Sequence, residues 1–264
     1  MTKFRWILVM MLVLAFTLHA SWFTSLKGSG RIVTDERKIS PDFSGVAVAN
    51  HGDLYVKIGD AVSLTLEGDD NILPRIVTRV EGDTLVIRTE KSLRSGWSSR
   101  RGIRYHLTVK KGQLNHLSLS SHGDAEVPEL TGKNVRVRLS SHGDMDIKMI
   151  KTDDLELRLS SHGDIDIGVL TADSIDARMS SHGKIRISEG KVRDQDISLS
   201  SHGDYLAAGV RSDHCRVSNS SHGTIKVWVE KSLSARLTSH SRLYLKGDPE
   251  IDASKNSREK IRKI

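Results

Sequence analysis

Apolar and charged residues alternate strictly through the middle of the chain. Over 135–149 the apolar side chains fall at odd positions, and the charged side chains fall at even positions. The same alternation returns over 155–167. A period of two is typical of a β-strand with one buried and one exposed face. The pattern therefore predicts short strands and disfavours helices over this region.

A fixed motif separates the alternating segments. Ser-Ser-His-Gly recurs at a strict interval of twenty residues, with its histidines at His122, His142, His162, His182, His202 and His222. An early related copy begins at Asn50, and a late one, Thr238-Ser239-His240, follows the array. The parity does not change across the motif, so the second serine and the glycine belong to the inward set and the histidine to the outward set. Small inward residues in the middle of a strand run predict a tight bend.

The repeat predicts the fold. A twenty-residue unit with two short strands cannot bury its apolar face alone and must stack on its neighbours. The expected fold class is all-β, a parallel β-helix (solenoid) with coils of about 20 residues and strands ~4.8 Å apart in successive coils. Segments 131–134, 151–154 and 171–174 are expected to be the turns that close the coils.

The chain divides into four expected parts. Residues 1–20 form a signal peptide or N-terminal anchor, 31–114 an irregular β section that caps the solenoid, and 115–247 the regular repeats. Residues 248–264 form a basic tail that is expected to be disordered, with contact to an anionic surface as the alternative.

The first twenty residues predict export. Two early positive charges precede an apolar run from Trp6 to Leu18, which fits a signal peptide better than a full membrane span. Ala20 suits a cleavage site but Leu18 does not, so an uncleaved anchor with membrane association through residues 1–23 stays open. Either way, the body is expected in the periplasm, at the outer membrane or on the cell surface.

Charge and cysteine content narrow the function. The net charge is +7, of which the leader carries +2 and the tail +4, so the body is nearly neutral and no basic face predicts nucleic-acid binding. Cys215 is the single cysteine and cannot form an internal disulfide. It occupies the repeat position of Val135, Leu155 and Ile175, so we expect it to be buried.

Several ordered motifs resemble one family. These are the segments 33–37, 43–46, 50–53 and 67–74, together with the later Ser-x-x-Gly-Asp copies. Over about 31–247 the chain resembles the DUF2807 family, the putative auto-transporter adhesin "head GIN" domain. The resemblance implies a right-handed β-helix in an exported protein and implies little about activity. Family members commonly have Ser-Gly-Ser-Gly-Asp at this bend, whereas here Ser121 replaces glycine and His122 replaces serine.

The histidine column is the candidate site, and its chemistry has several interpretations. A nucleophilic triad is disfavoured because Ser120, His122 and Asp124 are alternate residues of one strand and project side by side. Metal binding would need rings of neighbouring coils to rotate toward one ion, with carboxylates adding ligands or orienting the rings. The other two are a structural surface ladder and a flat imidazole and hydroxyl stripe that contacts a glycan or protein. The candidate carboxylates are Asp124, Asp144, Asp164 and Asp204, with Lys184 and Thr224 in their place in two copies.

The favoured function is a non-catalytic, exported envelope protein of the adhesin type that binds a surface, glycan or protein partner and needs no cofactor. The alternatives are a metal-binding envelope protein and a polysaccharide-active β-helix enzyme. The enzyme would depend on the loop 92–101, with Arg94, Arg100 and Arg101. Self-association by end-to-end or edge packing stays open. Histidine protonation in mild acid would place like charges in a row, so stability or self-association is expected to depend on pH.

Overall fold

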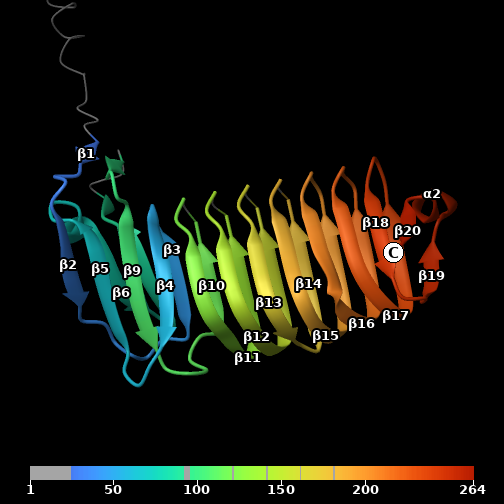
Figure 1. The fold of residues 1–264 in the computed structure, drawn as a ribbon, viewed down its shortest axis with the longest axis horizontal. Coiled ribbons are helices and arrows are strands. Elements are labelled where there is room, and N and C mark those ends of the chain that lie inside the picture. Colours follow the sequence, from blue (N-terminus) through green and yellow to red (C-terminus); the bar gives the residue numbers. More distant parts are fainter. Residues whose placement is uncertain (1–24, 92–95, 121, 141, 161, 181) are drawn as a thin grey trace, which may run out of the picture.

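The repeats form a β-solenoid of about seven turns with coils of about 20 residues, as expected (Figure 1). The computed structural model describes residues 25–91, 96–120, 122–140, 142–160, 162–180 and 182–264. The expected leader, 1–20, lies outside these residues. The elements in chain order are β1 (Leu26–Lys27), β2 (Ile32–Arg37), β3 (Gly45–Ala49), β4 (Gly52–Ile58), β5 (Ser63–Asp69), η1 (Leu73–Arg75), β6 (Ile76–Glu81), β7 (Thr84–Thr89), β8 (Trp97–Ser98), β9 (Ile103–Val109), β10 (His116–Leu119), β11 (Ala125–Leu139), β12 (Met145–Leu159), β13 (Ile165–Thr171), β14 (Ser174–Met179), β15 (Lys184–Leu199), β16 (Asp204–Asn219), β17 (Thr224–Leu237), β18 (Arg242–Lys246), β19 (Glu250–Ala253), α2 (Lys255–Arg258) and β20 (Ile261–Lys263).

Successive coils pair in parallel, with a register of twenty residues from β10 to the first half of β17 and of eighteen residues in the last coils. Val135 pairs with Leu155, and Leu155 pairs with Ile175. The inward-facing residues stack into one continuous apolar core, and nearly all of them are less than 5% exposed. The alternation in the sequence thus determines which side of each strand is buried. The length of the repeat determines which residue of the next coil it pairs with.

Each coil has two faces joined by two bends (Figure 1). Face 1 contains β2, β5, β9, β4, β13, β18 and β20, and the first halves of β11, β12, β15, β16 and β17. Face 2 contains β6, β7, β3, β10, β14 and β19, and the second halves of the same long strands. We call the Ser-Ser-His-Gly bend the tip bend and the opposite one the base bend. Within the described residues, no helix is long and apolar enough to cross a membrane.

The base bends lie at the expected positions but are not unpaired turns. Thr131 pairs with Lys151 and Gly132 with Thr152, so strand hydrogen bonding continues around the bend. The Thr152 hydroxyl donates to the carbonyl oxygens of Lys133 and Asp154, at 3.0 and 2.9 Å. Of the three expected turns, the one at 171–174 interrupts the strand, at 172–173. Stacking of equivalent coils satisfies the backbone groups that an isolated turn would leave open.

The N-terminal section caps the solenoid with antiparallel strands. β2 pairs with β5 and β5 with β9 on face 1, while β6 pairs with β7 on face 2, all antiparallel. A change of direction at an open end interrupts the template that parallel coils would offer to another chain. A separate two-stranded sheet joins β1 and β8 in parallel.

The C-terminal segment forms two strands and a short helix, contrary to the sequence prediction. Residues 248–264 were expected to be disordered, but β19 pairs with β17, β20 pairs with β18, and α2 lies between them. The hydroxyl of buried Ser257 in α2 accepts a hydrogen bond from the backbone N–H of Leu237 at 3.0 Å. Ile251, Ala253 and Ile261 pack against the last coil of the core. The basic residues that suggested disorder project outward, and the apolar ones between them complete one more coil.

Candidate functional site

The tip bends are built on a column of glycines. A Cβ atom on Gly143 would lie 2.0 Å from the carbonyl oxygen of Gly123, and one on Gly163 would lie 1.9 Å from that of Gly143. Gly123 stands in the same relation to Gly52. Real Cβ atoms do not approach an oxygen this closely, so glycine is needed for the close approach of neighbouring coils at the bend. The histidine that precedes each glycine is thereby held at a fixed spacing from the next.

The histidine side chains form one continuous stack. Between His122 and His222, ring centroids of neighbouring coils are 4.7–5.2 Å apart and the ring planes differ by 2–6°. The stack extends past the six expected histidines to His51, 4.9 Å from His122, and to His240, 4.7 Å from His222. We call this set the histidine ridge: His51, His122, His142, His162, His182, His202, His222 and His240. All eight residues are exposed.

Stacking decides which part of each ring can meet a ligand. Every inner ring has a neighbour on both flat faces, so the solvent-accessible part is its edge. The stripe of flat imidazole faces that the sequence suggested is therefore replaced by a row of ring edges, which carry the nitrogen atoms. At the N-terminal end, Trp97 meets the His51 ring edge-to-face at 5.8 Å and 86°.

The first ridge residue is anchored from inside the core. The hydroxyl of buried Tyr105 donates to Oδ1 of Asn50, which precedes His51, at 2.9 Å. Burial raises the pKa of Tyr105, so the phenol keeps its proton as a donor. Burial, followed by the nearby His122, lowers the pKa of His51. Within the repeats a serine stands at the position of Asn50.

The four candidate aspartates form hydrogen bonds between neighbouring coils. Each accepts a hydrogen bond at Oδ1 from the backbone N–H one coil later, and each of these bonds is 2.8 Å long. The donors are Asp144, Asp164, Lys184 and Thr224, and the acceptors are Asp124, Asp144, Asp164 and Asp204. Asp53 begins the series with a bond of 3.1 Å from Asp124. A carboxylate that accepts a backbone N–H clamps two coils together beside the ridge.

Two interruptions show how this aspartate ladder works. Lys184 offers no carboxylate to the next coil, and the N–H of Asp204 bonds instead to the carbonyl of Gly183 at 3.2 Å. Thr224 likewise leaves the N–H of Arg242 to the carbonyl of Gly223 at 3.3 Å. Lys184 also pairs with Asp164, with Nζ 3.5 Å from Oδ2. The backbone is satisfied in both cases, so the ladder tolerates gaps.

The geometry sets conditions on metal binding. Imidazole lone pairs lie in the ring plane, so those of neighbouring parallel rings lie in separate parallel planes, and one ion cannot lie in both planes. Bridging two neighbours would require the rings to leave the stack. Among the described residues, no group of three or more His, Cys, Asp and Glu side chains is arranged to hold a metal ion.

The serines of the tip bend contact backbone. The hydroxyls of Ser140 and Ser200 donate to the carbonyl oxygens of Leu119 and Met179 in the preceding coil, at 3.4 and 3.5 Å. Ser221 is buried, and its hydroxyl donates to the carbonyl oxygen of Ser201 in the preceding coil. These contacts join coil to coil, and among these described tip-bend serines none is bonded head-to-tail to a histidine, as a triad would need.

The candidate enzyme loop contributes β8. Arg94 lies outside the described residues, and Arg100 and Arg101 are exposed. A shallow cavity of about 310 Å³ lies between β1 and this loop, and its lining includes Arg100 and buried Asp69. Asp69 accepts from the N–H of Gly30 and the hydroxyl of Ser99, at 2.6 and 2.5 Å. Its carboxylate therefore ties the segment after β1 to the loop after β8.

A family model matches most of the chain. The family model described as "Putative auto-transporter adhesin, head GIN domain" (DUF2807) matches residues 42–249. The chain belongs to the DUF2807 family. No curated protein matches it significantly.

Solved structures share the DUF2807 solenoid at low sequence identity. A putative lipid binding protein from Parabacteroides distasonis has a TM-score of 0.75 and 22% identity, over 91% of this chain and 100% of that one. A putative adhesin from the same organism has a TM-score of 0.74 and 19% identity, over 91% and 97%. A putative adhesin from Parabacteroides merdae has a TM-score of 0.68 and 14% identity, over 91% and 95%. These similarities establish the fold, and none of the three names is that of an enzyme.

Proposed function

We propose that this DUF2807 protein is an exported, non-catalytic envelope protein of the adhesin type that binds a surface glycan along the histidine ridge. The observation that carries the proposal is the uninterrupted row of eight exposed rings. Its spacing of 4.7–5.2 Å is held by the glycine column and the aspartate ladder. A rigid, evenly spaced row suits a partner that is itself a repeating polymer.

The chemistry of the exposed edge selects the partner class. A ring edge offers one N–H donor and one nitrogen acceptor in the neutral form. Polysaccharides present hydroxyl groups at regular intervals and can exchange hydrogen bonds with such a row. Many weak contacts repeated along one polymer add up through effective concentration. A single isolated sugar would therefore bind far more weakly than the polymer.

Repetition also argues for binding over catalysis. One active site needs one set of groups, whereas the ridge repeats the same side chain in each coil. Export rests on the charge and apolar pattern of residues 1–20 and on the adhesin description of the family. One structural relative is named for lipid binding, so anionic lipid is the alternative ligand that the experiment must separate.

The test is a pull-down of insoluble envelope polysaccharide by purified protein starting at residue 25, in the presence of EDTA. We expect a triple variant, His142→Ala, His162→Ala and His182→Ala, to lose at least tenfold in retention. His106→Ala is the matched control, since this partly exposed histidine lies on face 1 and stacks on Tyr55 outside the ridge.

Two results would overturn the proposal. The first is equal retention of the triple variant and the wild type. The second is binding of the wild type to vesicles with anionic lipid but to none of the polysaccharides. Vesicles of neutral lipid and a short oligosaccharide serve as negative controls.

A further inference from the structure

Face 1 carries its charges in two blocks. Its outward positions in β11–β13 are mostly acidic, and those in β15–β18 and β20 are mostly basic. The acidic block is Asp124, Glu126, Asp144, Asp146, Asp164 and Asp166, with Lys148 among them. The basic block is Lys184, Arg186, Lys226, Arg242, Lys246 and Arg262, with Asp204 among them.

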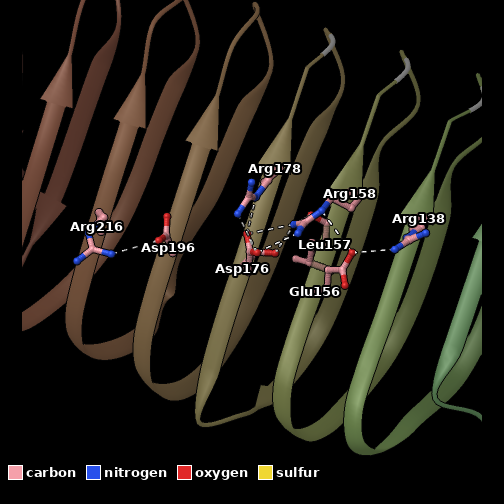
Figure 2. A network of polar contacts seen from close by, with 8 residues as sticks. All are labelled: Arg138, Glu156, Leu157, Arg158, Asp176, Arg178, Asp196 and Arg216. Carbon is pink, nitrogen blue, oxygen red and sulfur yellow. Dashed lines mark hydrogen bonds and ion pairs between the residues drawn. The ribbon is translucent and has the colours of Figure 1, made fainter.

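Face 2 shows that this segregation is not a general property of the solenoid. There, the acidic row Glu156, Asp176 and Asp196 lies beside the basic row Arg138, Arg158 and Arg178, and the two rows neutralise one another (Figure 2). Glu156 lies between Arg138 and Arg158, at 3.0 and 3.4 Å. Asp176 contacts Arg158 at 2.9 Å and Arg178 at 3.1 Å. Its pKa is lowered, chiefly by the hydrogen bond from Arg158.

Among the described residues, the internal ion pairs of the two blocks are one within the acidic block, Lys148 with Asp146 at 2.6 Å, and two at the boundary between the blocks. Where the blocks meet, Lys184 pairs with Asp164 and Arg186 with Asp166, at 3.5 and 2.5 Å. Five exposed residues away from this boundary form no ion pair within the described part of the chain. They are Glu126 in the acidic block and Lys226, Arg242, Lys246 and Arg262 in the basic block.

Apolar groups accompany both blocks. Met149 and Val169 pair with each other next to the acidic block, 41% and 39% exposed, and are two of the few large apolar side chains so open to solvent. In the basic block, Lys246 covers the ring of half-buried Trp228 at 3.7 Å, and Lys226 lies 5.6 Å from the Tyr244 ring. An interface needs such apolar and aromatic anchors beside its charges.

We propose that face 1 is a self-association surface that docks on face 1 of a second copy with the two solenoids antiparallel. A two-fold axis parallel to the strands reverses the solenoid direction, so the acidic block of each copy lies over the basic block of the other. An axis parallel to the solenoid would place like charges together. With the axis between β15 and β16, Glu126 of each copy lies opposite Arg262 of the other, and Asp166 lies opposite Lys226, in the same cross-strand row.

The dimensions predict a weak dimer. Seven rungs ~4.8 Å apart and about five residues of each strand give a contact of roughly 500 Å² per copy. Stable interfaces bury about 800 Å² per partner, so this one belongs to the transient class. Charge complementarity would govern its specificity and make it weaken with salt.

This inference goes beyond the proposed function and does not depend on it, since the ridge lies at the tip edge and the contact lies on face 1. The antiparallel arrangement keeps both ridges along the same edge of the dimer. The pairing would double the row of ring edges that faces one side.

Sedimentation velocity of the 25–264 protein tests the inference. We expect a concentration-dependent dimer in about 50 mM salt that is lost at about 500 mM, where exposed charges are strongly screened. An acidic-block variant, Glu126→Lys with Asp146→Lys, changes the charge of the acidic block from −5 to −1, and a basic-block variant, Lys226→Glu with Arg242→Glu, changes that of the basic block from +5 to +1. Each variant alone should be monomeric, and an equimolar mixture should form a heterodimer.

Arg138→Glu with Arg216→Glu on face 2 is the matched control and should leave the dimer unchanged. Circular dichroism checks that every variant keeps the β spectrum, and a misfolded pair is replaced by Glu126→Gln or Lys226→Gln, each of which should weaken the dimer. A wild-type monomer at all concentrations in low salt would overturn the inference. So would a dimer that survives the face 1 reversals, or a mixture that stays monomeric.

Discussion

The ring of His162 lies parallel to that of His182, with centroids 5.1 Å apart and 2° between the planes. Ring pairs at this distance contribute about 0.5–1.5 kcal/mol, and exposure places this pair at the low end. We expect His162→Ala and His182→Ala each to lower the free energy of unfolding by less than about 1 kcal/mol. A double-mutant cycle in urea should show a coupling of about 0.5 kcal/mol.

The control for this double-mutant cycle is the pair His162 and His222, which are not neighbours in the ridge. Their substitutions should be additive. Equal coupling in both cycles would show that adjacent rings do not stabilise each other.

The close approach at the tip bend predicts intolerance of any side chain. We expect Gly163→Ala to lower the free energy of unfolding by about 2–4 kcal/mol, because its Cβ would lie 1.9 Å from the carbonyl oxygen of Gly143. Thermal or urea unfolding measures the loss. Ser160→Ala, an exposed position of the same bend, should change stability by less than about 0.5 kcal/mol. Similar values for the two variants would contradict the described packing.

The aspartate ladder predicts a ranking of two substitutions. Asp144 accepts the N–H of Asp164 at 2.8 Å, so Asp144→Ala should cost about 1–2 kcal/mol of unfolding free energy. Asp144→Asn keeps an acceptor oxygen and should cost about half as much, since the bond is then no longer charge-assisted. If the alanine variant is as stable as the wild type, the ladder does not clamp the coils.

Stability should fall in mild acid. Burial, together with Arg138 and Arg136, lowers the pKa of His116, and burial and His122 lower that of His51. The unfolded chain therefore takes up protons near pH 6.5 that the folded chain does not, so the free energy of unfolding decreases as pH falls below about 6.5 and is fully retained above it. Urea unfolding from pH 8 to pH 5 measures this slope.

The substitution His116→Gln should flatten part of that slope, because it removes one of the two groups. His106→Gln is the control for the loss of a histidine on the opposite face. A stability that is constant from pH 8 to pH 5 would contradict the assignment.

The single thiol should be inert in the folded protein. Cys215 is 4% exposed, and burial raises the pKa of its thiol, so both access and thiolate formation are suppressed. We expect a thiol reagent at pH 8 to label Cys215 only after unfolding in denaturant. Rapid stoichiometric labelling of the native protein would show that this coil opens.

Much of the fold could be predicted from the sequence because one alternating pattern repeats at one interval. That pattern gives the strands of the repeats, their inward residues and the buried position of Cys215. It also places His162 outside the core. It cannot give the rotation of the ring about its side-chain bonds, so stacking, and with it the loss of the flat faces, became visible only in three dimensions.

Other features were missed because the sequence signal pointed elsewhere. The charges of Lys255 and Lys260 suggested disorder, although Ile251 and Ile261 provide the apolar positions of another coil. The carboxylate of Asp144 suggested a ligand, whereas its partner is a backbone N–H that no side-chain motif reveals. Gln195 occupies an apolar column and is buried, and its Oε1 accepts from the hydroxyl of Tyr205 at 2.9 Å.

The glycine column has a consequence for how such a chain can change length. Gly143, Gly163, Gly183 and Gly223 each lie against the carbonyl of the glycine one coil earlier, and the two ends are closed by different structures, antiparallel strands at one and β19, α2 and β20 at the other. A gain or loss of residues that keeps this contact therefore comes in whole coils, twenty residues long in the array and eighteen at its C-terminal end. Each such event would lengthen or shorten the histidine ridge by one ring, so the length of the ridge would change in steps of one coil.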